Sequence, residues 1–439
     1  MTIVGLTKNP DRGRGAADRP AVLYVVHRLP YPPDKGDRIR SFHVLRSLSG
    51  RAAVHLACLA DEEPEKSAVA ALRRYCERVA VVRLGRATRG ARALASLASG
   101  RTATEGAFDA PGLRRILRRW TGKTRFAAAL ASSSGVAPYL QIEGLREVPS
   151  VVDLMDVDSQ KWLDYAAAAR GPRAWLYRVE GRRMRRLESG LADSMSALTV
   201  VTEAEADIYR RFRPDGPIHS IPNGVDQDYF RPDPRRAEGG CVFVGALDYR
   251  PNVDGACWFC REAWPAIRVR SRGARLSLVG RRPARAVRDL ARLEGVEVVG
   301  QVPDVRPYMA DAAVVLAPLR IARGVQNKVL EALAMGKAVV ASPQALEGLR
   351  VEPGVHLLVA STPEGWSDAV THLLGAPEVR RRLGGAGRRY VEEEHRWDRC
   401  LEPMAGLLGL PASAREVGRP LVLTLSDLGR EEPCLQPRN

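Results

Sequence analysis

Short runs of apolar residues alternate with longer stretches of helical periodicity along most of the chain. The apolar runs that we interpret as strands are residues 21–29, 54–59, 79–84, 126–131, 150–155 and 197–202, then 242–247, 275–279, 296–299, 312–319 and 338–341. Apolar strands that alternate with helices are typical of parallel sheets covered by helices on both faces. The pattern therefore predicts an α/β fold with two doubly wound parallel sheets.

A turn-rich segment, Ile221-Pro-Asn-Gly-Val-Asp226, separates the two series of strands. Asn-Gly within it favours a positive φ, so we expect the chain to turn there between two domains. We predict a first domain over residues 21–215 and a second over residues 216–387. A chain of 439 residues with 45% hydrophobic content can bury two cores. Residues 1–20 are polar and are predicted to be disordered, and residues 411–439 form a tail.

The most informative stretch is the helix predicted between the last two apolar runs, over residues 326–335. Gly324 stands just ahead of this helix and Gly336 just past its end, where glycine commonly ends a helix. The first turn offers free backbone N–H groups and a partial positive charge. Because Arg323 and Lys328 add cations at the same place, the sequence predicts an anion site.

Glu331 follows Lys328 by three residues, which places both side chains on one face of the helix. If the helix start and Lys328 hold a phosphate, Glu331 lies within reach of a ribose diol, which a carboxylate accepts from. The alternative interpretation is an ordinary surface ion pair between the two side chains.

The first apolar run is followed by a turn-rich loop and by a helix predicted over residues 37–48. Ligands of open α/β sheets bind at the C-terminal ends of such strands. Gly36 permits close approach of the backbone to a ligand, and Lys35, Arg38 and Arg40 supply positive charge. The alternative is a tight turn with a solvated basic rim.

Three carboxylates, Asp153, Asp156 and Asp158, stand where the run 150–155 ends. Paired carboxylates at a sheet edge can bind a metal ion or act as a base. Alternatively, Asp158 or the following Ser159 caps the next helix.

The segment from Arg320 to Val340 resembles the donor-site signature of family 4 glycosyltransferases, in which Glu-x7-Glu precedes Ala-x-Ala-x-Gly-x-Pro-Val-Val. The resemblance implies retaining enzymes with the GT-B fold, two facing Rossmann-like domains with a cleft between them. Glu331 matches the second Glu of the signature, whereas Arg323 replaces the first Glu, which contacts the donor sugar in the family. The variant Arg-Gly-Val-Gln-Asn-Lys-Val-Leu-Glu-Ala is similar to a subgroup found beside exosortase-linked exopolysaccharide genes.

The resemblance also implies where the donor binds. Many family members carry Gly-Arg-Leu and a later Lys-Gly in the first loop of the second domain, but here Ala246 replaces the Arg and no Lys follows in that loop. The diphosphate charge is then met by other cations, among which we favour Lys328. The expected donor-binding residues are Lys35, Gly36, Gly245, Arg250, Arg281, Arg323, Gly324, Asn327, Lys328 and Glu331.

On the acceptor side, the resemblance places Asp156 and Asp158 at the cleft, and we take them as the catalytic candidates. Retaining members need no metal, and the departing phosphate oxygen can deprotonate the acceptor, so we expect neither a metal nor a further cofactor. The segment around residues 388–408, with His395-Arg-Trp397, is similar to the part of the family that returns to the first domain.

The net charge of +17 raises the question of a nucleic-acid partner. Only seven of the 68 basic residues are Lys, and the Arg residues are spread through every helix, so we expect no nucleic acid. The charge remains compatible with an anionic donor or an anionic membrane surface. The basic amphipathic segment Arg114 to Trp120 is one candidate for a membrane contact, with a solvated face as the alternative.

No apolar run is long enough to span a bilayer, and the first twenty residues lack the apolar core of a signal peptide. The seven cysteines show no disulfide spacing, which suits a reducing compartment. Cys257-Trp-Phe-Cys260 is a C-x-x-C that we interpret as buried thiols, with metal or redox use as the alternative. We expect a cytoplasmic protein, in part at the inner membrane face.

The sequence thus favours a hexosyltransferase-type enzyme that moves a sugar from a nucleotide-diphosphate donor to a lipid-linked or polysaccharide acceptor with retention. Two other hypotheses remain. A nucleotide-sugar epimerase of the same fold needs acid and base groups in the cleft, and a non-catalytic nucleotide-sugar-binding protein would account for Arg323 at the first Glu position.

Overall fold

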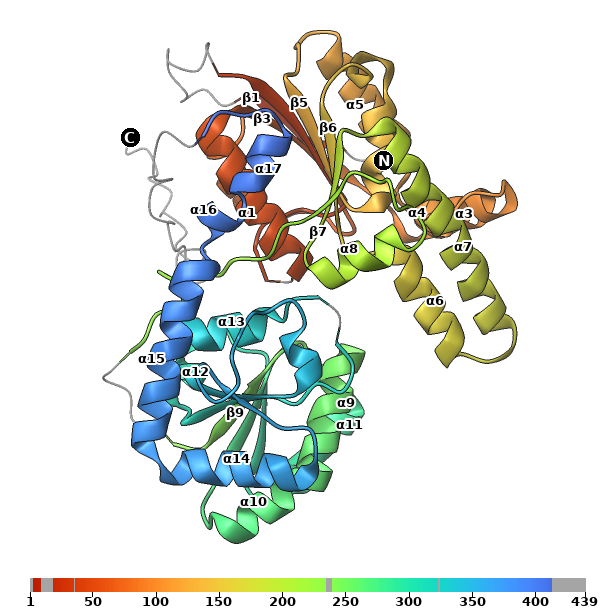
Figure 1. Ribbon diagram of the computed structural model, residues 1–439. Helices are drawn as coiled ribbons and strands as arrows, with labels where there is room; N and C mark the ends of the chain where they lie inside the picture. The colour runs from red at the N-terminus through yellow and green to blue at the C-terminus, as the bar shows by residue number, and fades with distance from the viewer. Residues whose placement is uncertain (1–2, 9–18, 35, 234–238, 323, 413–439) are drawn as a thin grey trace, which may run out of the picture.

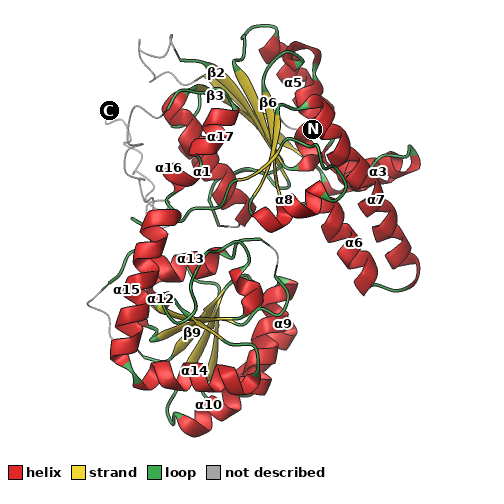
Figure 2. Cartoon of the chain, in the orientation of Figure 1, coloured by secondary structure: helices red, strands yellow, loops and turns green. Residues whose placement is uncertain are grey.

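The computed structural model describes residues 3–8, 19–34, 36–233, 239–322 and 324–412. Figure 1 shows two layered units, one above the other, each built on its own sheet. Figure 2 shows that helices flank each sheet. The predicted α/β fold with two doubly wound sheets is confirmed.

The sheet of the first domain has the strand order β1-β4-β3-β2-β5-β6-β7-β8. Its strands are β1 (Ile3–Lys8), β2 (Ala21–Val26), β3 (Ala53–Ala60), β4 (Arg78–Arg83), β5 (Ala128–Ser132), β6 (Ser150–Met155), β7 (Ala197–Val200) and β8 (Ile218–Ser220). Strands β2 to β8 pair in parallel, whereas β1 lies antiparallel to β4.

Strand β1 corrects the prediction that residues 1–20 are disordered. Ile3 pairs with Val82 and Lys8 with Arg78, so this segment extends the sheet beyond β4. The physical reason is that β4 would otherwise present an edge of unpaired N–H and C=O groups, which a short strand satisfies.

Both faces of the first sheet are buried, which explains its continuous apolar runs. Along β2, Leu23 and Val25 belong to one core cluster, whereas Val22 and Tyr24 belong to the cluster on the opposite face. Successive side chains of a strand point to opposite faces, so a sheet covered on both sides requires apolar residues at every position.

The helices of the first domain include a hairpin of α6 and α7 that projects from the body of the domain (Figure 1). The α-helices are α1 (Gly36–Arg51), α2 (Lys66–Arg73), α3 (Arg86–Ala98), α4 (Ala103–Phe108), α5 (Pro111–Thr121), α6 (Asp158–Ala168), α7 (Gly171–Ser194) and α8 (Glu203–Arg210). Two short 3₁₀ helices, Ser134–Gln141 and Glu143–Leu145, follow β5.

Helix α5 carries the basic segment considered above for a membrane contact. Its apolar side chains Leu113, Ile116, Leu117 and Trp120 are buried in the core. Arg114 pairs with Asp109, and the remaining arginines of the segment are exposed. Because the apolar face already packs against the protein, α5 presents a solvated charged face, which is the alternative interpretation.

The sheet of the second domain has the order β11-β10-β9-β12-β13-β14, and all its pairs are parallel. Its strands are β9 (Cys241–Val244), β10 (Leu276–Val279), β11 (Val296–Gly300), β12 (Val314–Ala317), β13 (Ala338–Ala341) and β14 (Leu358–Val359). Its α-helices are α9 (Arg250–Trp258), α10 (Trp264–Arg270), α11 (Arg285–Arg288), α12 (Arg306–Asp311), α13 (Asn327–Ala334), α14 (Pro363–Gly375) and α15 (Pro377–Glu394). A π-helical turn, Phe259–Ala263, and 3₁₀ helices Asp289–Arg292 and Pro343–Leu346 complete the domain.

Cys257 and Cys260 lie at the junction of α9 with the π-helical turn. Both are buried free thiols, and burial raises the pKa of Cys260 to about 12. A thiol that stays protonated at neutral pH is a poor nucleophile and a poor metal ligand. The buried-thiol interpretation is therefore the one that the structure supports.

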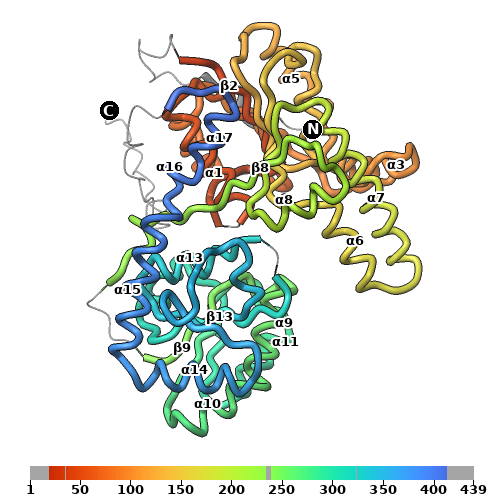
Figure 3. Tube along the Cα trace, viewed as in Figure 1, coloured from red at the N-terminus to blue at the C-terminus, as the bar shows by residue number. Residues whose placement is uncertain are grey.

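After α15 the chain returns to the first domain as α16 (Trp397–Cys400) and α17 (Glu402–Leu407). The trace in Figure 3 places this segment beside α1. Trp397, Leu401 and Met404 share a core cluster with residues of β2 and α1, and the Arg51 guanidinium pairs with Glu402. The last helices thus fasten the second domain to the first.

Candidate functional site

Helix α13 begins opposite the first domain, at the end of the loop that follows β12. It spans Asn327–Ala334, one residue shorter at each end than the predicted helix. Gly324 and Gly336 both have left-handed φ angles, +66° and +65°, which explains why glycine is used before and after the helix. Arg323 lies outside the described residues.

Lys328 is held in place by three neighbours in the second domain. Its Nζ atom donates to Asn252 Oδ1 at 2.5 Å and lies 4.7 Å from the centre of the Phe243 ring. A Cβ atom on Gly245 would lie 3.0 Å from the same Nζ atom, so glycine leaves the space that the lysine occupies. Burial lowers the pKa of Lys328 to about 7, and the nearby Glu331 offsets only part of this effect.

Glu331 lies on the next turn of α13 and is partly buried. Within the described ranges its carboxylate makes no hydrogen bond, and it forms no ion pair with Lys328 within 4 Å. Burial raises the pKa of Glu331 to about 7, against the opposing effect of Lys328. The surface ion pair considered above is therefore wrong, and the carboxylate is available to a ligand.

The first domain faces this helix with the start of α1. A Cβ atom on Gly36 would lie 3.9 Å from Asn327 Nδ2, so the two domains approach each other closely at Gly36. Asn223, in the connection between the domains, donates its amide to Asn327 Oδ1 at 3.4 Å. Nearby, Arg281 of the second domain lies 3.7 Å from Asp34 of the first. Lys35 lies outside the described residues.

Asp156 is the acidic residue that approaches the loop before α13. A Cβ atom on Gly324 would lie 3.0 Å from Asp156 Oδ1. The preceding Met155 has a φ of +67°, and Ser133, at the end of neighbouring β5, has a φ of +93°. Left-handed φ angles at non-glycine residues are rare and cluster at functional sites. The strained ends of β5 and β6 support a functional role for this edge.

Asp158 is engaged in a different way. It is the first residue of α6, accepts a hydrogen bond from the Ser134 hydroxyl at 2.8 Å and lies 3.8 Å from Lys161. These contacts hold the start of α6, but the capping alternative is wrong, because the N-cap residue is Val157 and no side chain caps the helix. Its predicted catalytic role stays a prediction.

Arg40 and Asp153 form a buried pair that the sequence analysis did not foresee. Arg40, expected to supply positive charge to a ligand, is 1% exposed and donates to both oxygens of Asp153. Its remaining nitrogen, Nη1, donates to Ile221 O and to Asn223 Oδ1, both at 2.9 Å. Arg40 therefore holds the connection between the domains. Because its charge is paired with Asp153 in the core, it is not available to a phosphate.

Two further groups were missed. Asn252, which positions Lys328, lies in the first turn of α9, directly after the loop that begins at Gly245. His27, directly after β2, lies with Nε2 3.3 Å from Asp37 Oδ2 and with Nδ1 3.1 Å from Ser132 O. Such a His–Asp pair at the sheet edge is suited to proton transfer.

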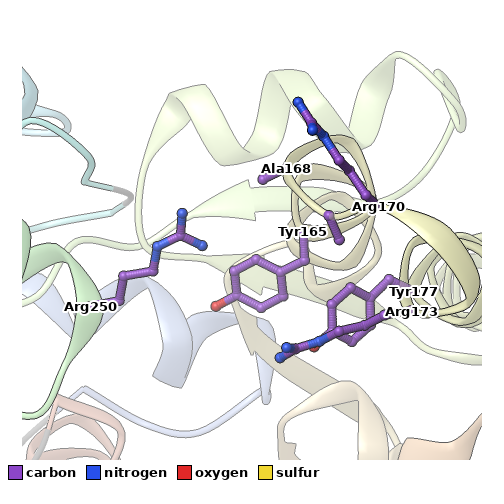
Figure 4. A pocket seen from close by; sticks show the side chains of 7 residues that line it. Tyr165, Ala168, Arg170, Arg173, Tyr177 and Arg250 are labelled. Carbon is purple, nitrogen blue, oxygen red and sulfur yellow. The ribbon is translucent and has the colours of Figure 1, made fainter.

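Arg250, at the start of α9, is exposed and lines a cavity together with the α6–α7 hairpin (Figure 4). The donor-side positions that the structure brings together are Gly36, Gly245, Gly324, Asn327, Lys328 and Glu331, with Arg281 at Asp34. In the described ranges no cluster of three His, Cys, Asp or Glu residues has a geometry that could hold a metal ion. Among the same residues, no helix is long and apolar enough to cross a membrane.

Comparison with known proteins shows which families and structures the chain is similar to. Residues 238–376 match the model of the family described as glycosyl transferases group 1. The chain is 31% identical over 230 residues to the GDP-mannose-dependent alpha-(1-6)-phosphatidylinositol monomannoside mannosyltransferase of Mycobacterium tuberculosis. This match covers 46% of the chain and 59% of that relative, so the chain spans less than two thirds of the relative's length.

Solved structures with the same arrangement cover nearly the whole described part. Sucrose-phosphate synthase from Thermosynechococcus elongatus superposes with a TM-score of 0.64 at 18% identity, covering 89% of this chain and 98% of that one. Anabaena HepE in complex with UDP and glucose also superposes with a TM-score of 0.64, at 13% identity, covering 89% of this chain and all of the other. At these identities the likeness concerns the fold. The chain therefore has the GT-B fold, and most of its second domain matches the model of the group 1 glycosyl transferases.

Proposed function

We propose that the protein is a retaining glycosyltransferase that moves a hexose from a nucleotide-diphosphate sugar to a lipid-linked or polysaccharide acceptor, in exopolysaccharide biosynthesis. The observation that carries the proposal is the start of α13, where Asn327 lies opposite Gly36 of the other domain and is followed on the same helix by Lys328 and by Glu331, whose carboxylate makes no hydrogen bond or ion pair among the described residues. The donor would lie between them, with its diphosphate at Lys328 and its ribose at Glu331.

The chemistry asked of this site is electrostatic. As the bond between the sugar carbon and the diphosphate breaks, negative charge develops on the departing phosphate oxygen. Free N–H groups at the start of α13 and the Lys328 ammonium stabilise that charge, and they do so more strongly in a cleft that excludes water. The acceptor hydroxyl bonds to the sugar carbon, and its proton passes to the departing oxygen, so no metal is required.

The acceptor side is assigned to the first domain. Asp156 lies beside Gly324, at the edge where the transferred sugar would stand, and we give it the role of orienting the acceptor hydroxyl. The UDP and glucose in the HepE complex support a nucleotide-sugar donor, and the phosphatidylinositol monomannoside in the name of the mycobacterial relative supports a lipid-linked acceptor. We place the protein at the cytoplasmic membrane face, where a lipid-linked acceptor is presented.

The test is a panel of nucleotide sugars. A donor present at a hundred times its dissociation constant stabilises the folded protein by about 2.7 kcal/mol, which raises the melting temperature measurably. With the stabilising donor, transfer or slow hydrolysis releases the nucleoside diphosphate, whereas an epimerase converts the donor without releasing it. Binding without either reaction would contradict the transferase and leave a nucleotide-sugar-binding protein.

The epimerase keeps one specific observation in its favour. His27 and Asp37 form a pair at the sheet edge, which adds a histidine to the acid and base material that the sequence offered only in Asp153, Asp156 and Asp158. Among the described residues, no hydrogen bond or ion pair joins this pair to α13, so the transferase remains the better supported of the two functions.

A further inference from the structure

A second site lies outside the donor cleft, between the α6–α7 hairpin and the second domain. It is a cavity of about 500 Å³. Tyr165, Arg170, Arg173 and Tyr177 line it from the hairpin, and Arg250 closes it from α9. Figure 4 shows Arg250 pointing toward the hydroxyl of Tyr165 from the opposite element.

The lining is cationic. It contains three arginines and no acidic residue. Within the described ranges, Arg170 and Arg250 have no carboxylate within 4 Å, and Arg173 donates to a neutral group, the Tyr177 hydroxyl, at 2.7 Å. Guanidinium groups left without a protein carboxylate are well suited to a phosphate, which they bind in a bidentate manner.

Aromatic side chains form the floor of the same cavity. The rings of Tyr165 and Tyr177 lie 6.0 Å apart, and Trp162 lies 5.4 Å from Tyr177. Tyrosine combines an apolar face with a polar hydroxyl, so it suits a group that is apolar on one side and hydroxylated on the other. A glycolipid phosphate meets that description, and the apolar ring faces also suit the hydrocarbon chain of an isoprenoid phosphate.

Helix α6 connects the cavity to the acceptor-side candidates, because it begins at Asp158 and carries Tyr165. Lys161 lies on α6 one turn before Tyr165 and 3.8 Å from Asp158. Burial opposes its charge, but Asp158, Tyr165, Asp156 and Tyr249 together raise the pKa of Lys161 above its ordinary value. These groups therefore lie within electrostatic range of one another, and Tyr165, which lines the cavity, is one of them.

The hairpin also exposes apolar side chains. Trp175 is 64% and Leu176 42% exposed, close to the turn that joins α6 to α7. Trp175 lies two positions from both Arg173 and Tyr177, about half a helical turn away, so it faces away from the cavity. Exposed Arg178 follows it. Tryptophan beside arginine is typical of a segment that rests at the surface of a bilayer.

We infer that this cavity binds the phosphate of a lipid-linked acceptor, delivered from an anionic membrane on which Trp175 and Leu176 rest. That the bound lipid phosphate is an acceptor rests on the proposed function, but its binding to the cavity can be measured without any donor. It names the class of acceptor as an isoprenoid or glycolipid phosphate.

The test uses the full chain and phosphatidylcholine vesicles with or without a polyprenyl phosphate. We expect sedimentation with the doped vesicles to fall at least tenfold in Arg170→Gln/Arg173→Gln. The matched control, Arg115→Gln/Arg118→Gln, removes two exposed charges from α5 of the same domain and should bind as the wild type does. An equal loss in the control would overturn the inference, because it would show attraction to overall charge.

A soluble arm separates the lipid surface from the phosphate. Geranyl phosphate is titrated into the Lys328→Met protein, in which the cation of the donor site is absent, with and without Arg170→Gln/Arg173→Gln. We expect the two hairpin substitutions to weaken this binding at least tenfold. Trp175→Ala/Leu176→Ala should leave the affinity for geranyl phosphate unchanged while reducing sedimentation with vesicles. If geranyl phosphate binds equally well with and without Arg170 and Arg173, the proposed site is wrong.

Failure of the proposed function is distinguishable from failure of this site. Nucleotide-induced thermal shifts report the donor cleft alone, and they should be the same in wild type and Arg170→Gln/Arg173→Gln. A protein that binds polyprenyl phosphate through these arginines but shifts with no nucleotide would keep the site and lose the transferase.

Discussion

Arg40 and Asp153 face each other as a fully buried bidentate pair, with Nε 2.8 Å from Oδ2 and Nη2 2.9 Å from Oδ1. The Thr199 hydroxyl donates to the same carboxylate, and the remaining donor of Arg40 reaches Asn223 in the connection between the domains. One ion pair thus joins α1, β6 and β7 to the segment that leads to the second domain.

Asp153→Asn should strongly destabilise the first domain, because it leaves the Arg40 charge buried without a partner. The expected cost is about 3–5 kcal/mol, the range for breaking a buried pair from one side. Arg38→Met is the control on the same helix, since Arg38 pairs with exposed Asp34 and should cost less than about 1 kcal/mol. Urea midpoints of the two variants measure the difference, and equal midpoints would show that the pair contributes nothing.

Glu331→Gln should keep the shape of the site and lose the charged acceptor for the ribose. We expect nucleotide affinity to fall by about 1.5–3 kcal/mol, as for a hydrogen bond to a charged group. Isothermal titration with the nucleotide found in the donor panel measures it. Glu364→Gln, at an exposed position of α14, is the matched control. A folded Glu331→Gln protein that binds the nucleotide with wild-type affinity would contradict the assignment of Glu331 to the ribose.

The same carboxylate makes a prediction about pH without ligand. Between its ordinary pKa of 4.5 and its folded pKa of about 7, Glu331 keeps a proton in the folded protein that the unfolded chain has released. Its contribution to stability therefore falls as pH rises through that window, by roughly 3 kcal/mol at about 1.4 kcal/mol per pKa unit. Lys328 is charged in both states over this range, because its lowered pKa of about 7 lies at the upper limit.

Melting temperatures at pH 5 and pH 8 check this. Glu331→Gln cannot ionise, so its melting temperature should rise relative to wild type on going from pH 5 to pH 8. The subtraction removes the contribution of the titrating groups that do not interact with Glu331, whereas Lys328, which does interact with it, stays in the difference. A mutant that loses stability relative to wild type at pH 8 would mean that the charged carboxylate is stabilised in the ligand-free protein.

Gly36→Val should spare the fold and depress transfer. The nearest atom to a new Cβ is Asn327 Nδ2 at 3.9 Å, so the free protein has room for it. The branched side chain would nevertheless occupy the gap through which α1 and α13 meet a donor. We expect kcat/KM to fall at least tenfold with an unchanged melting temperature, and Gly36→Ala to lose less. Full activity of the valine variant would make Gly36 a turn residue only.

The sequence allowed α13 and its two glycines to be predicted almost to the residue, because helix ends depend on local backbone preferences. The alternation of strands and helices likewise reports burial on both faces of a sheet, which each segment shows by itself. Strand β1 was not predicted, because a single short edge strand is defined by the strand with which it pairs rather than by its own hydrophobic pattern.

The role of Arg40 could not be predicted for a related reason. In sequence it belongs to a basic cluster at a loop, yet its partner Asp153 lies 113 positions away. Whether an arginine meets a phosphate or a buried aspartate depends on the packing of α1 against β6, which no local pattern contains. The spacing of Lys328 and Glu331 placed both on one face but could not show that Asn252 takes the ammonium.

The two passages of the chain between its domains run side by side. Val225 pairs with Arg396, the His395 ring bonds to Asn223 O at 2.8 Å, and Gly224 has no room for a side chain against Trp397. Two adjacent tethers restrict the domains to rotation about a single axis, as in a clamshell. Points far from that axis must travel furthest, so opening should separate Arg281 from Asp34 before it disturbs Asn223 and Asn327, and substrates would enter from the outer side.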